Sequence, residues 1–369
     1  MTINCINNKR ILVTGACGTV GSKLIDHLAN EKNYRPLEII GIDNNEGELF
    51  LHDQKYLHKP KINFEYLDIR DSKNLRKRFE GVNIVFHCAA LKHVITSEIS
   101  PEQFILTNIN GLQNVIEAAS DNNVEKLIFT SSDKAVNPTN VMGASKLMGE
   151  KIITAANKKS SSKNRTIFAS TRFGNVLGSR GSVVPIFYNQ IMNEKPITIT
   201  HKDMTRFVMS IDRAADLILN SAHLSCGGEV FITKMPVLKI EDLARAMLRE
   251  MLPSASNDEI IKYPIQYIGI KPGEKLYEEL MTSEEVPRTF DLGNYFIIKP
   301  AYMDIYRNMN YTYGNMKLSK VTKQYISDGE EFLKIDEIRE LMRSNNLFDL
   351  PQDGMQNRYW PGDKLNHTI

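Results

Sequence analysis

The sequence of 369 residues has few cysteines, a single tryptophan, no long apolar run and no excess of either charge. Its four cysteines are far apart and form no CxxC pair, so the spacing predicts neither a disulfide framework nor a metal site. No stretch approaches about 18 consecutive apolar residues, so no membrane span is expected. The formal net charge is only +2, which argues against broad electrostatic capture of nucleic acid. We therefore expect a soluble, cytoplasmic protein.

The hydrophobic pattern predicts an α/β protein. Hydrophobic residues make up 42% of the chain and charged residues 24%, which is typical of a globular protein with a sizeable core. Strand-like runs alternate with segments that have the apolar spacing of helices. The expected strands are 10–14, 37–42, 62–67, 82–90, 126–130, 166–172 and 229–232, and the expected helices are 18–30, 72–79 and 101–120. Such alternation predicts a Rossmann-type, doubly wound parallel sheet.

The length predicts about two structural units. Residues 1–175, with returning segments near 208–234, are expected to form the sheet domain. The chain becomes less regular after residue 175, and its Pro and Gly signals predict a smaller, mostly C-terminal substrate lobe from 176–207 and 235–310. Residues 311–369 are expected to be a C-terminal extension, with a loosely ordered polar tail.

A glycine loop follows the first strand and predicts a dinucleotide site. The sequence TGACGTVG at 14–21 has glycines at positions that permit a tight turn and a close backbone approach to pyrophosphate. The helix that follows offers free N–H groups to phosphates. The loop residues expected at the cofactor are Gly15, Cys17, Gly18, Thr19, Val20 and Gly21. A turn without any ligand is the alternative.

Acidic and small residues at other strand ends extend this prediction. Asp43 ends the second strand, where a carboxylate suits a ribose 2′-hydroxyl and would repel a 2′-phosphate, so NAD is favoured and NADP is the alternative. Asp68 could reach an adenine amine, and the small residues after the fourth strand would let the backbone approach the cofactor. The remaining candidates for the cofactor site are Ile69, Ala89, Ala90, Lys92, Asn108 and Lys146.

Several longer motifs carry a resemblance to a known family. They are TGACGTVG at 14–21, SSDKAVNPTN at 131–140, MGASK at 142–146, RFGNVLGSRGSVVP at 172–185, MTRF at 204–207 and KPGEKL at 271–276. The first resembles the extended short-chain dehydrogenase/reductase family. The others are similar to nucleotide-sugar 4,6-dehydratases of bacterial polysaccharide biosynthesis, which act on nucleotide-linked N-acetylglucosamine, and in particular to enzymes of legionaminic-acid pathways.

The resemblance implies an NAD-dependent lyase that converts UDP- or GDP-GlcNAc to a 4-keto-6-deoxy sugar. It implies that Asp133 is the acid for the C6 hydroxyl and Lys134 the base at C5. These roles need an aspartate pKa near neutrality and a lysine pKa lowered towards the working pH. Lys146 would bond the nicotinamide ribose.

Position 142 departs from the pattern of the wider superfamily. That superfamily uses a YxxxK pair, whereas here the residue four positions before Lys146 is Met142. A thioether neither takes nor gives a proton. The resemblance counters an inactive protein, since one branch of the dehydratases has Met at this place. Ser132 or an ordered water is then the candidate for the C4 hydroxyl proton.

The other predictions concern substrate and assembly. The residues expected to contact the nucleotide sugar are His93, Met142, Asn175, Arg180, Val184, Arg206 and Lys271. Arg180 and Arg206 are suited to phosphate but could be ordinary salt-bridge partners. A nucleotide-sugar epimerase, a dehydratase that inverts C5 and a catalytically silent NAD-binding protein stay open as alternatives. We also expect a homodimer or larger homo-oligomer.

Overall fold

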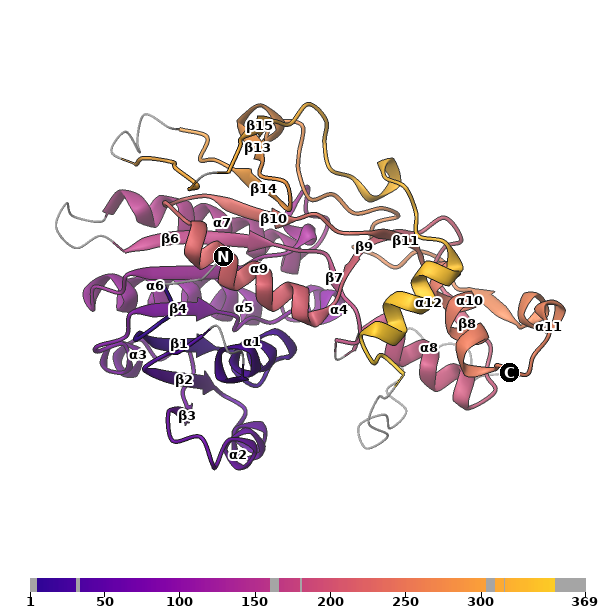
Figure 1. Cartoon of the computed structure of the whole chain (residues 1–369), viewed down its shortest axis with the longest axis horizontal. Helices are drawn as coiled ribbons and strands as arrows, with labels where there is room; N and C mark the ends of the chain where they lie inside the picture. Colours follow the sequence, from indigo (N-terminus) through magenta and orange to yellow (C-terminus); the bar gives the residue numbers. More distant parts are fainter. Residues whose placement is uncertain are drawn as a thin grey trace.

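The computed structural model describes residues 5–30, 34–159, 166–179, 181–302, 309–314 and 316–348. Within these residues a ten-stranded sheet forms the larger part of the molecule, and a smaller lobe extends from one end of it (Figure 1). The parallel strands have the order β3-β2-β1-β4-β5-β6-β10. They are β1 (Arg10–Thr14), β2 (Glu38–Asp43), β3 (Ile62–Tyr66), β4 (Ile84–His87), β5 (Lys126–Thr130), β6 (Ile167–Arg172) and β10 (Val230–Thr233). The order is that of a Rossmann-type sheet, so the predicted fold class is confirmed.

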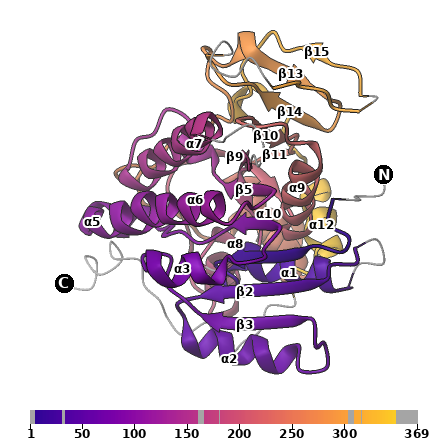
Figure 2. The same cartoon turned by 90° about the vertical axis from the view of Figure 1, so that its left-hand side faces the viewer.

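Helices cover both faces of the sheet, as the alternating pattern predicts (Figure 2). One face holds α1 (Thr19–Asn30) and α9 (Ile211–Leu224). The other face holds α3 (Ser72–Arg78), α6 (Leu112–Asp121) and α7 (Val141–Lys159). Successive residues of β1 point into different cores, Ile11 and Val13 towards α1 and Leu12 towards α6. Because both faces are buried, central strands such as β1 and β5 are mostly apolar along their length.

Some elements differ from the prediction. The helix expected at 101–120 consists of α5 (Pro101–Phe104), a π-helical segment η1 (Ile105–Gly111) and α6. Strand β4 ends before residue 90 because the chain leaves the sheet to pass close over Gly15. The sequence did not predict α2 (Glu46–Lys55), whose Phe50 and Leu51 are exposed, so its apolar residues form no buried stripe.

The smaller lobe has its own sheets and core. A three-stranded sheet has the order β11-β9-β7, and a two-stranded sheet pairs β12 with β8. The lobe strands are β7 (Asn175–Val176), β8 (Ile197–Ile199), β9 (Thr205–Met209), β11 (Val237–Lys239) and β12 (Ile265–Tyr267). The lobe helices are α8 (Val183–Met192), α10 (Ile240–Met251), α11 (Asn257–Lys262) and α12 (Ile335–Ser344). A short helix, α4 (Val94–Ile99), packs on α5 and α7 of the larger part. Fully buried Leu243 and Met247 of α10 lie at the centre of this core.

The predicted boundary between lobe and extension needs correction. β13 (Thr289–Asp291), β14 (Tyr295–Ile298) and β15 (Ser319–Lys320) join the main sheet as antiparallel strands beyond β10, instead of belonging to the lobe. The apolar residues of β14 pair with β10 and so cover an edge that would otherwise be open. α12, expected in a separate extension, packs on α10 in the lobe. Most of the predicted loose tail, residues 349–369, lies outside the described residues.

Within the described ranges, no helix is both long enough and apolar enough to cross a bilayer.

Candidate active site

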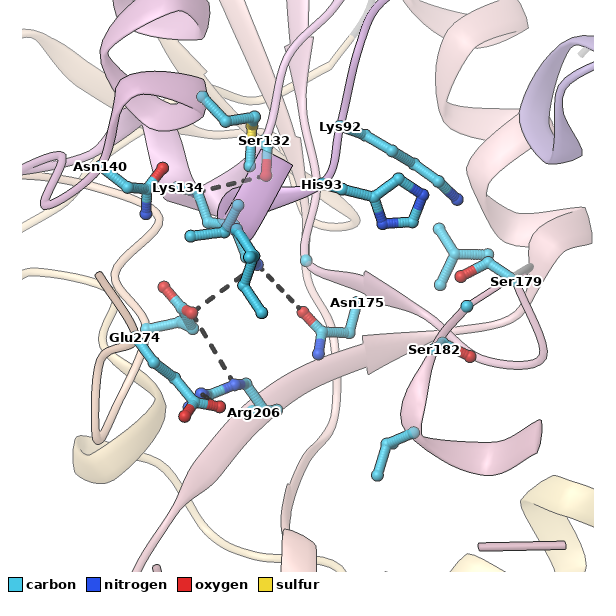
Figure 3. A pocket seen from close by; sticks show the side chains of 18 of the residues that line it. Lys92, His93, Ser132, Lys134, Asn140, Asn175, Ser179, Ser182, Arg206 and Glu274 are labelled. Carbon is cyan, nitrogen blue, oxygen red and sulfur yellow. Dashed lines mark hydrogen bonds and ion pairs between the residues drawn. The ribbon is translucent and has the colours of Figure 1, made fainter. Parts of the chain in front are cut away.

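A cavity of about 690 Å³ lies between the carboxyl ends of the parallel strands and the lobe. Its lining comes from the loop after β1, the ends of β4 and β5, the segment after β6, and two lobe segments near 198–206 and 268–278. Open α/β sheets bind ligands at this end of their strands, and the volume is in the range of ligand-binding clefts. Figure 3 shows part of its wall.

The glycine loop forms one wall by close packing of backbone. Gly15 has φ +66°, and a Cβ there would lie 2.6 Å from the amide nitrogen of Ala89. A Cβ at Gly21 would lie 2.2 Å from the carbonyl oxygen of Gly15. Side chains are thus excluded at both positions, and the start of α1 faces the cavity directly. This cradle fits a pyrophosphate at a helix N-terminus. The predicted loop residues that line the cavity are Gly15, Gly18, Thr19, Val20 and Gly21.

Cys17 and Asp43 lie beside that wall but do not line the cavity. The backbone N–H of Cys17 donates to Oδ2 of Asp43 at 3.0 Å, and the N–H of Asn45 donates to Oδ1 at 3.0 Å. The carboxylate therefore fixes the turn at the end of β2. Each oxygen has a lone pair beyond this bond, so the ribose contact of Asp43 stays a prediction.

Four other predicted cofactor residues do not line the cavity. Asp68 forms an ion pair with Arg70, Oδ2 to Nη2 at 2.6 Å, and the hydrogen bond from Arg70 holds the pKa of Asp68 below its usual value. Ile69 packs in the core beneath α6. The N–H of Ala89 donates to Oγ1 of Thr14 at 3.2 Å. Asn108 is the fourth.

Asn108 is buried and its amide is used internally. It accepts from the N–H of Leu91 at 2.8 Å, and it donates to the carbonyl of Leu91 at 3.0 Å and to Oγ of Ser145 at 2.9 Å. The π-helical η1 carries it, and π segments inside helices are frequent at functional sites. Asn108 thus holds the loop after β4 against α7, while Ala90 and Lys92 of that loop line the cavity.

Lys146 is a buried residue of the cavity wall, where we expect the nicotinamide end of the cofactor. Its Nζ donates to the carbonyl of Thr130 at 2.8 Å and lies 4.7 Å from the ring centroid of Phe129. Burial lowers the pKa of Lys146 to about 8. The sequence did not single out His87, which shares a 2.7 Å hydrogen bond with Thr14 and whose pKa burial lowers to about 3, so it is a neutral core residue.

Met142 occupies the place of the superfamily tyrosine. It lies in the first turn of α7, four residues before Lys146, and both line the cavity. Met142 is 4% exposed, and its backbone N–H donates to Oγ of Ser97 at 3.2 Å.

The chain turns sharply at the predicted catalytic pair. A 3₁₀ turn, η2 (Asp133–Ala135), follows β5 and is capped by Oγ of Ser132. Oδ1 of Asp133 accepts from Oγ of Ser132 at 2.7 Å and from Nζ of Lys134 at 3.0 Å. Lys134 and Ser132 line the cavity, whereas fully buried Asp133 lies behind them. Oδ2 of Asp133 has no hydrogen-bond partner among the described residues.

Lys134 does not have the lowered pKa that the base role needs. Its Nζ lies 3.4 Å from Oδ1 of Asn175 (Figure 3). It also lies 3.0 Å from Oδ1 of Asp133 and 3.7 Å from Oε1 of Glu278. Burial by itself lowers the pKa of Lys134, but the two carboxylates outweigh burial and raise it. In this arrangement Lys134 is an ammonium.

Arg206 is fixed by the lobe. Its guanidinium donates to the backbone carbonyls of Thr205 at 2.8 Å and Lys275 at 2.9 Å, and it lies 3.6 Å from Glu274 and 3.7 Å from Glu278. It is 5% exposed and lines the cavity. Arg206 is therefore a buried ion-pair partner that also forms part of the cavity wall, and its contact with the nucleotide sugar stays a prediction.

The remaining substrate candidates divide into three groups. His93, Asn175 and Lys271 line the cavity. Val184 does not, because it points into the lobe core, while Val183 before it on α8 lines the cavity. Arg180 lies outside the described residues.

Sequence reasoning missed Glu278, which is 2% exposed in the cavity wall. It lies just beyond the KPGEKL motif in an unremarkable run of charges, and nothing in its spacing points to Lys134. Only the fold shows that this carboxylate is buried.

Comparison with known proteins finds a matching family model and several similar proteins. The family model described as "Polysaccharide biosynthesis protein" matches residues 11–300. A protein of Methanocaldococcus jannaschii named "Uncharacterized membrane protein MJ1061" is 42% identical over 88% of this chain and 95% of its own. A Rickettsia bellii protein named UDP-glucose 4-epimerase is 37% identical over 95% of this chain and 99% of its own. The X-ray structure of Pen from Bacillus thuringiensis superposes with a TM-score of 0.82 at 37% identity, over 93% of this chain and 99% of that one.

Proposed function

Because the chain belongs to the polysaccharide biosynthesis protein family, we propose that it is an NAD-dependent 4,6-dehydratase of nucleotide-diphosphate N-acetylglucosamine. The reaction would convert UDP- or GDP-GlcNAc to the 4-keto-6-deoxy sugar. One observation supports this most directly: Lys134 in the cavity wall forms an ion pair with Asp133 behind it. Oxidation at C4 begins both dehydration and epimerisation, whereas elimination of water also needs proton carriers at C5 and C6.

The residues around the glycine loop fit NAD. The side-chain-free cradle at Gly15 and Gly21 leaves room for a pyrophosphate, and Asp43 lies where a ribose would follow. NAD supplies reversible hydride transfer when bound. Lys146, an ammonium below pH of about 8, would orient the nicotinamide ribose. NADP stays the alternative.

Residues of the chain itself would then accept and donate the protons of the reaction. A ketone at C4 makes the C5 proton acidic, and the C6 hydroxyl leaves as water only if it is protonated. Lys134 lies at the cavity with Asp133 behind it and Glu278 beside it, so this part of the wall holds candidate proton carriers for both C5 and C6. Ser132 stays the candidate for the C4 hydroxyl proton, since its Oγ lies in the cavity wall and donates to Asp133.

A nucleotide-sugar 4-epimerase is the second candidate. The name of the Rickettsia bellii relative favours it. Met142 does not separate the two, because both reactions begin with oxidation at C4 and need a proton acceptor at the C4 hydroxyl. The Lys134–Asp133 pair favours the dehydratase. A dehydratase that also inverts C5 would use the same residues.

One experiment separates these functions. The purified holoenzyme is incubated with UDP-GlcNAc, GDP-GlcNAc or UDP-glucose without added oxidant, and products are analysed by mass spectrometry and NMR. Loss of one water from a GlcNAc nucleotide is expected. Unchanged mass with inverted C4 would establish the epimerase, and unchanged substrate with bound NAD would establish the silent binder.

Variants sharpen this experiment. Asp133→Asn is expected to reduce water loss at least 100-fold, because a carboxylate bound to Lys134 is removed. Glu284→Gln is the matched control, since Glu284 is 70% exposed and pairs with Arg288 away from the cavity. Full activity of Asp133→Asn would contradict the proposal.

We also propose a role in the synthesis of legionaminic-acid-type surface sugars and assembly as a homodimer or larger homo-oligomer. Exposed apolar side chains on neighbouring helices support self-association, namely Ile99, Ile105 and Met148. Sedimentation of the purified chain tests the assembly, and a monomer at micromolar concentration would contradict it.

A further inference from the structure

Glu278 is a buried carboxylate with an unused oxygen in the cavity wall. Its Oε1 lies 3.7 Å from Nζ of Lys134 and 3.7 Å from Nε of Arg206. Its Oε2 is buried and has no hydrogen-bond partner among the described residues. A buried carboxylate oxygen without a donor is costly unless a ligand or a function uses it. No group of the described residues uses this lone pair.

The backbone around Glu278 is held rigidly. Its N–H donates to Oγ of Ser327 at 2.9 Å, and its carbonyl accepts from the N–H of Ser327 at 2.9 Å. Ser327 also bonds Oγ1 of Thr205 in β9 at 2.8 Å. These bonds tie the backbone of Glu278 to β9 of the lobe, so its side chain starts from a fixed point, as a group that must meet a substrate atom requires.

Lys134, in contrast to Glu278, is held in its protonated form. Carboxylates of Asp133 and Glu278 flank its Nζ, and both favour the ammonium over the amine. An ammonium has no lone pair with which to take a proton. Burial meanwhile raises the pKa of Glu278, which makes its carboxylate a stronger base than an exposed glutamate.

We propose that Glu278 accepts the C5 proton of the sugar and that Lys134 donates the proton on which the C6 hydroxyl leaves. This assignment rests on the dehydratase function proposed above and reverses the role of Lys134 that the resemblance implies. Asp133 then acts as a positioning residue, which holds Nζ of Lys134 through Oδ1.

The step balances within the pair. The C5–H bond breaks, the proton goes to Glu278, and the electron pair forms the C4=C5 bond of an enolate. As the enolate returns to a ketone, a C5=C6 bond forms and the C6–O bond breaks. The leaving oxygen takes a proton from Nζ of Lys134 and departs as water. The proton on Glu278 then passes to the Lys134 amine, its neighbour at 3.7 Å, and both charges are restored.

The test isolates proton removal from the rest of the reaction. The 4-keto-6-deoxy product already carries the ketone, so its C5–H exchanges with D₂O whenever the base is intact. Exchange is followed by NMR for the wild-type holoenzyme, Glu278→Gln, Lys134→Arg and the control Glu284→Gln, after subtraction of the rate without enzyme. Lys134→Arg keeps the positive charge, but its guanidinium stays protonated.

Opposite outcomes are expected for the two key variants. Glu278→Gln loses C5 exchange at least 100-fold, whereas Lys134→Arg exchanges within tenfold of wild type although it no longer releases water from UDP-GlcNAc. Exchange by Glu278→Gln at the wild-type rate, or its loss in Lys134→Arg alone, would overturn the assignment. A wild-type enzyme that forms no product would instead overturn the proposed function.

A second variant guards against misfolding. Glu278→Asp keeps a carboxylate, so it is expected to restore part of the exchange that Glu278→Gln loses. Melting temperatures and the calorimetric Kd for UDP-GlcNAc are measured for each variant. If Glu278→Asp and Glu278→Gln are equally slow at an unchanged melting temperature, the carboxylate is not the base.

Discussion

The two walls of the cavity are built by opposite means. The glycine wall, residues 15–21, presents backbone to the ligand and excludes side chains by contact distance. The charged wall comprises Lys134, Arg206, Glu274 and Glu278, which form a cluster of buried or half-buried ion pairs. The first is made by one short segment and the second by three segments far apart in the chain. The comparison teaches that residues which bind a ligand by their shape can all lie in one short segment. The residues that set the charge of the cavity come together only when the whole chain folds.

The largest effect is expected from filling the glycine wall. In Gly21→Ala the new Cβ would lie 2.2 Å from the carbonyl oxygen of Gly15, so the backbone of the loop must shift. We expect the affinity for NAD to fall more than 100-fold, measured by titration calorimetry. Gly47→Ala is the control, because its Cβ would lie 3.9 Å from the nearest atom and should leave the affinity unchanged. Normal NAD binding by Gly21→Ala would show that the loop is not the cradle.

In the charged wall the expected effect is on stability. Arg206→Met removes the partner of Glu278 and leaves backbone carbonyls of the lobe without their donor. Removal of one member of a buried ion pair costs about 3–5 kcal/mol. Arg245→Met removes a half-exposed helical pair with Glu241 and should cost about 0.2–1 kcal/mol. Denaturant unfolding compares the two, and equal losses would contradict the distinction.

Lys146 lines the cavity apart from these two walls, and it makes stability and activity respond to pH in opposite directions. Burial lowers the pKa of Lys146 from 10.5 to about 8, so between these values the unfolded chain binds more protons than the folded one. The contribution of Lys146 to the free energy of unfolding therefore rises with pH in this window, by about 1.4 kcal/mol per unit at most. The ammonium needed at the ribose is lost over the same range, so kcat/KM should fall.

The test for Lys146 compares the wild type with a variant that lacks the titrating group. Melting temperature and kcat/KM are followed from pH 7 to 10 for the wild type, and the melting temperature also for Lys146→Met, which has no group to titrate. The wild type should gain stability relative to Lys146→Met as pH rises. If the difference stays flat across the window, the lysine is not perturbed.

The same contrast explains what the sequence could predict. The strands, their parallel order and the glycine loop follow from local patterns, because apolar runs and glycine spacing act over a few residues. Val184 was predicted to contact the substrate, but a motif match does not tell which residues of α8 face the cavity. In the structure Val183 lines the cavity and Val184 packs in the lobe core. Glu278 was missed because its contact with Lys134 joins segments more than 140 residues apart. β14 was assigned to the lobe because a short apolar strand does not specify which sheet edge it covers.

The smallest effect is expected at Met142, which lines the cavity from the start of α7. Its thioether has no proton to exchange, so Met142→Leu, which nearly conserves volume, should keep kcat within about threefold and cost less than about 1.5 kcal/mol. Ser132→Ala is the matched contrast, because it removes the hydroxyl that donates to Asp133 and should lower kcat by at least tenfold. Both are measured as rates of water loss at pH 7.5. A greater loss in Met142→Leu than in Ser132→Ala, at equal melting temperatures, would place the reacting C4 hydroxyl at the thioether and remove Ser132 from the proton path.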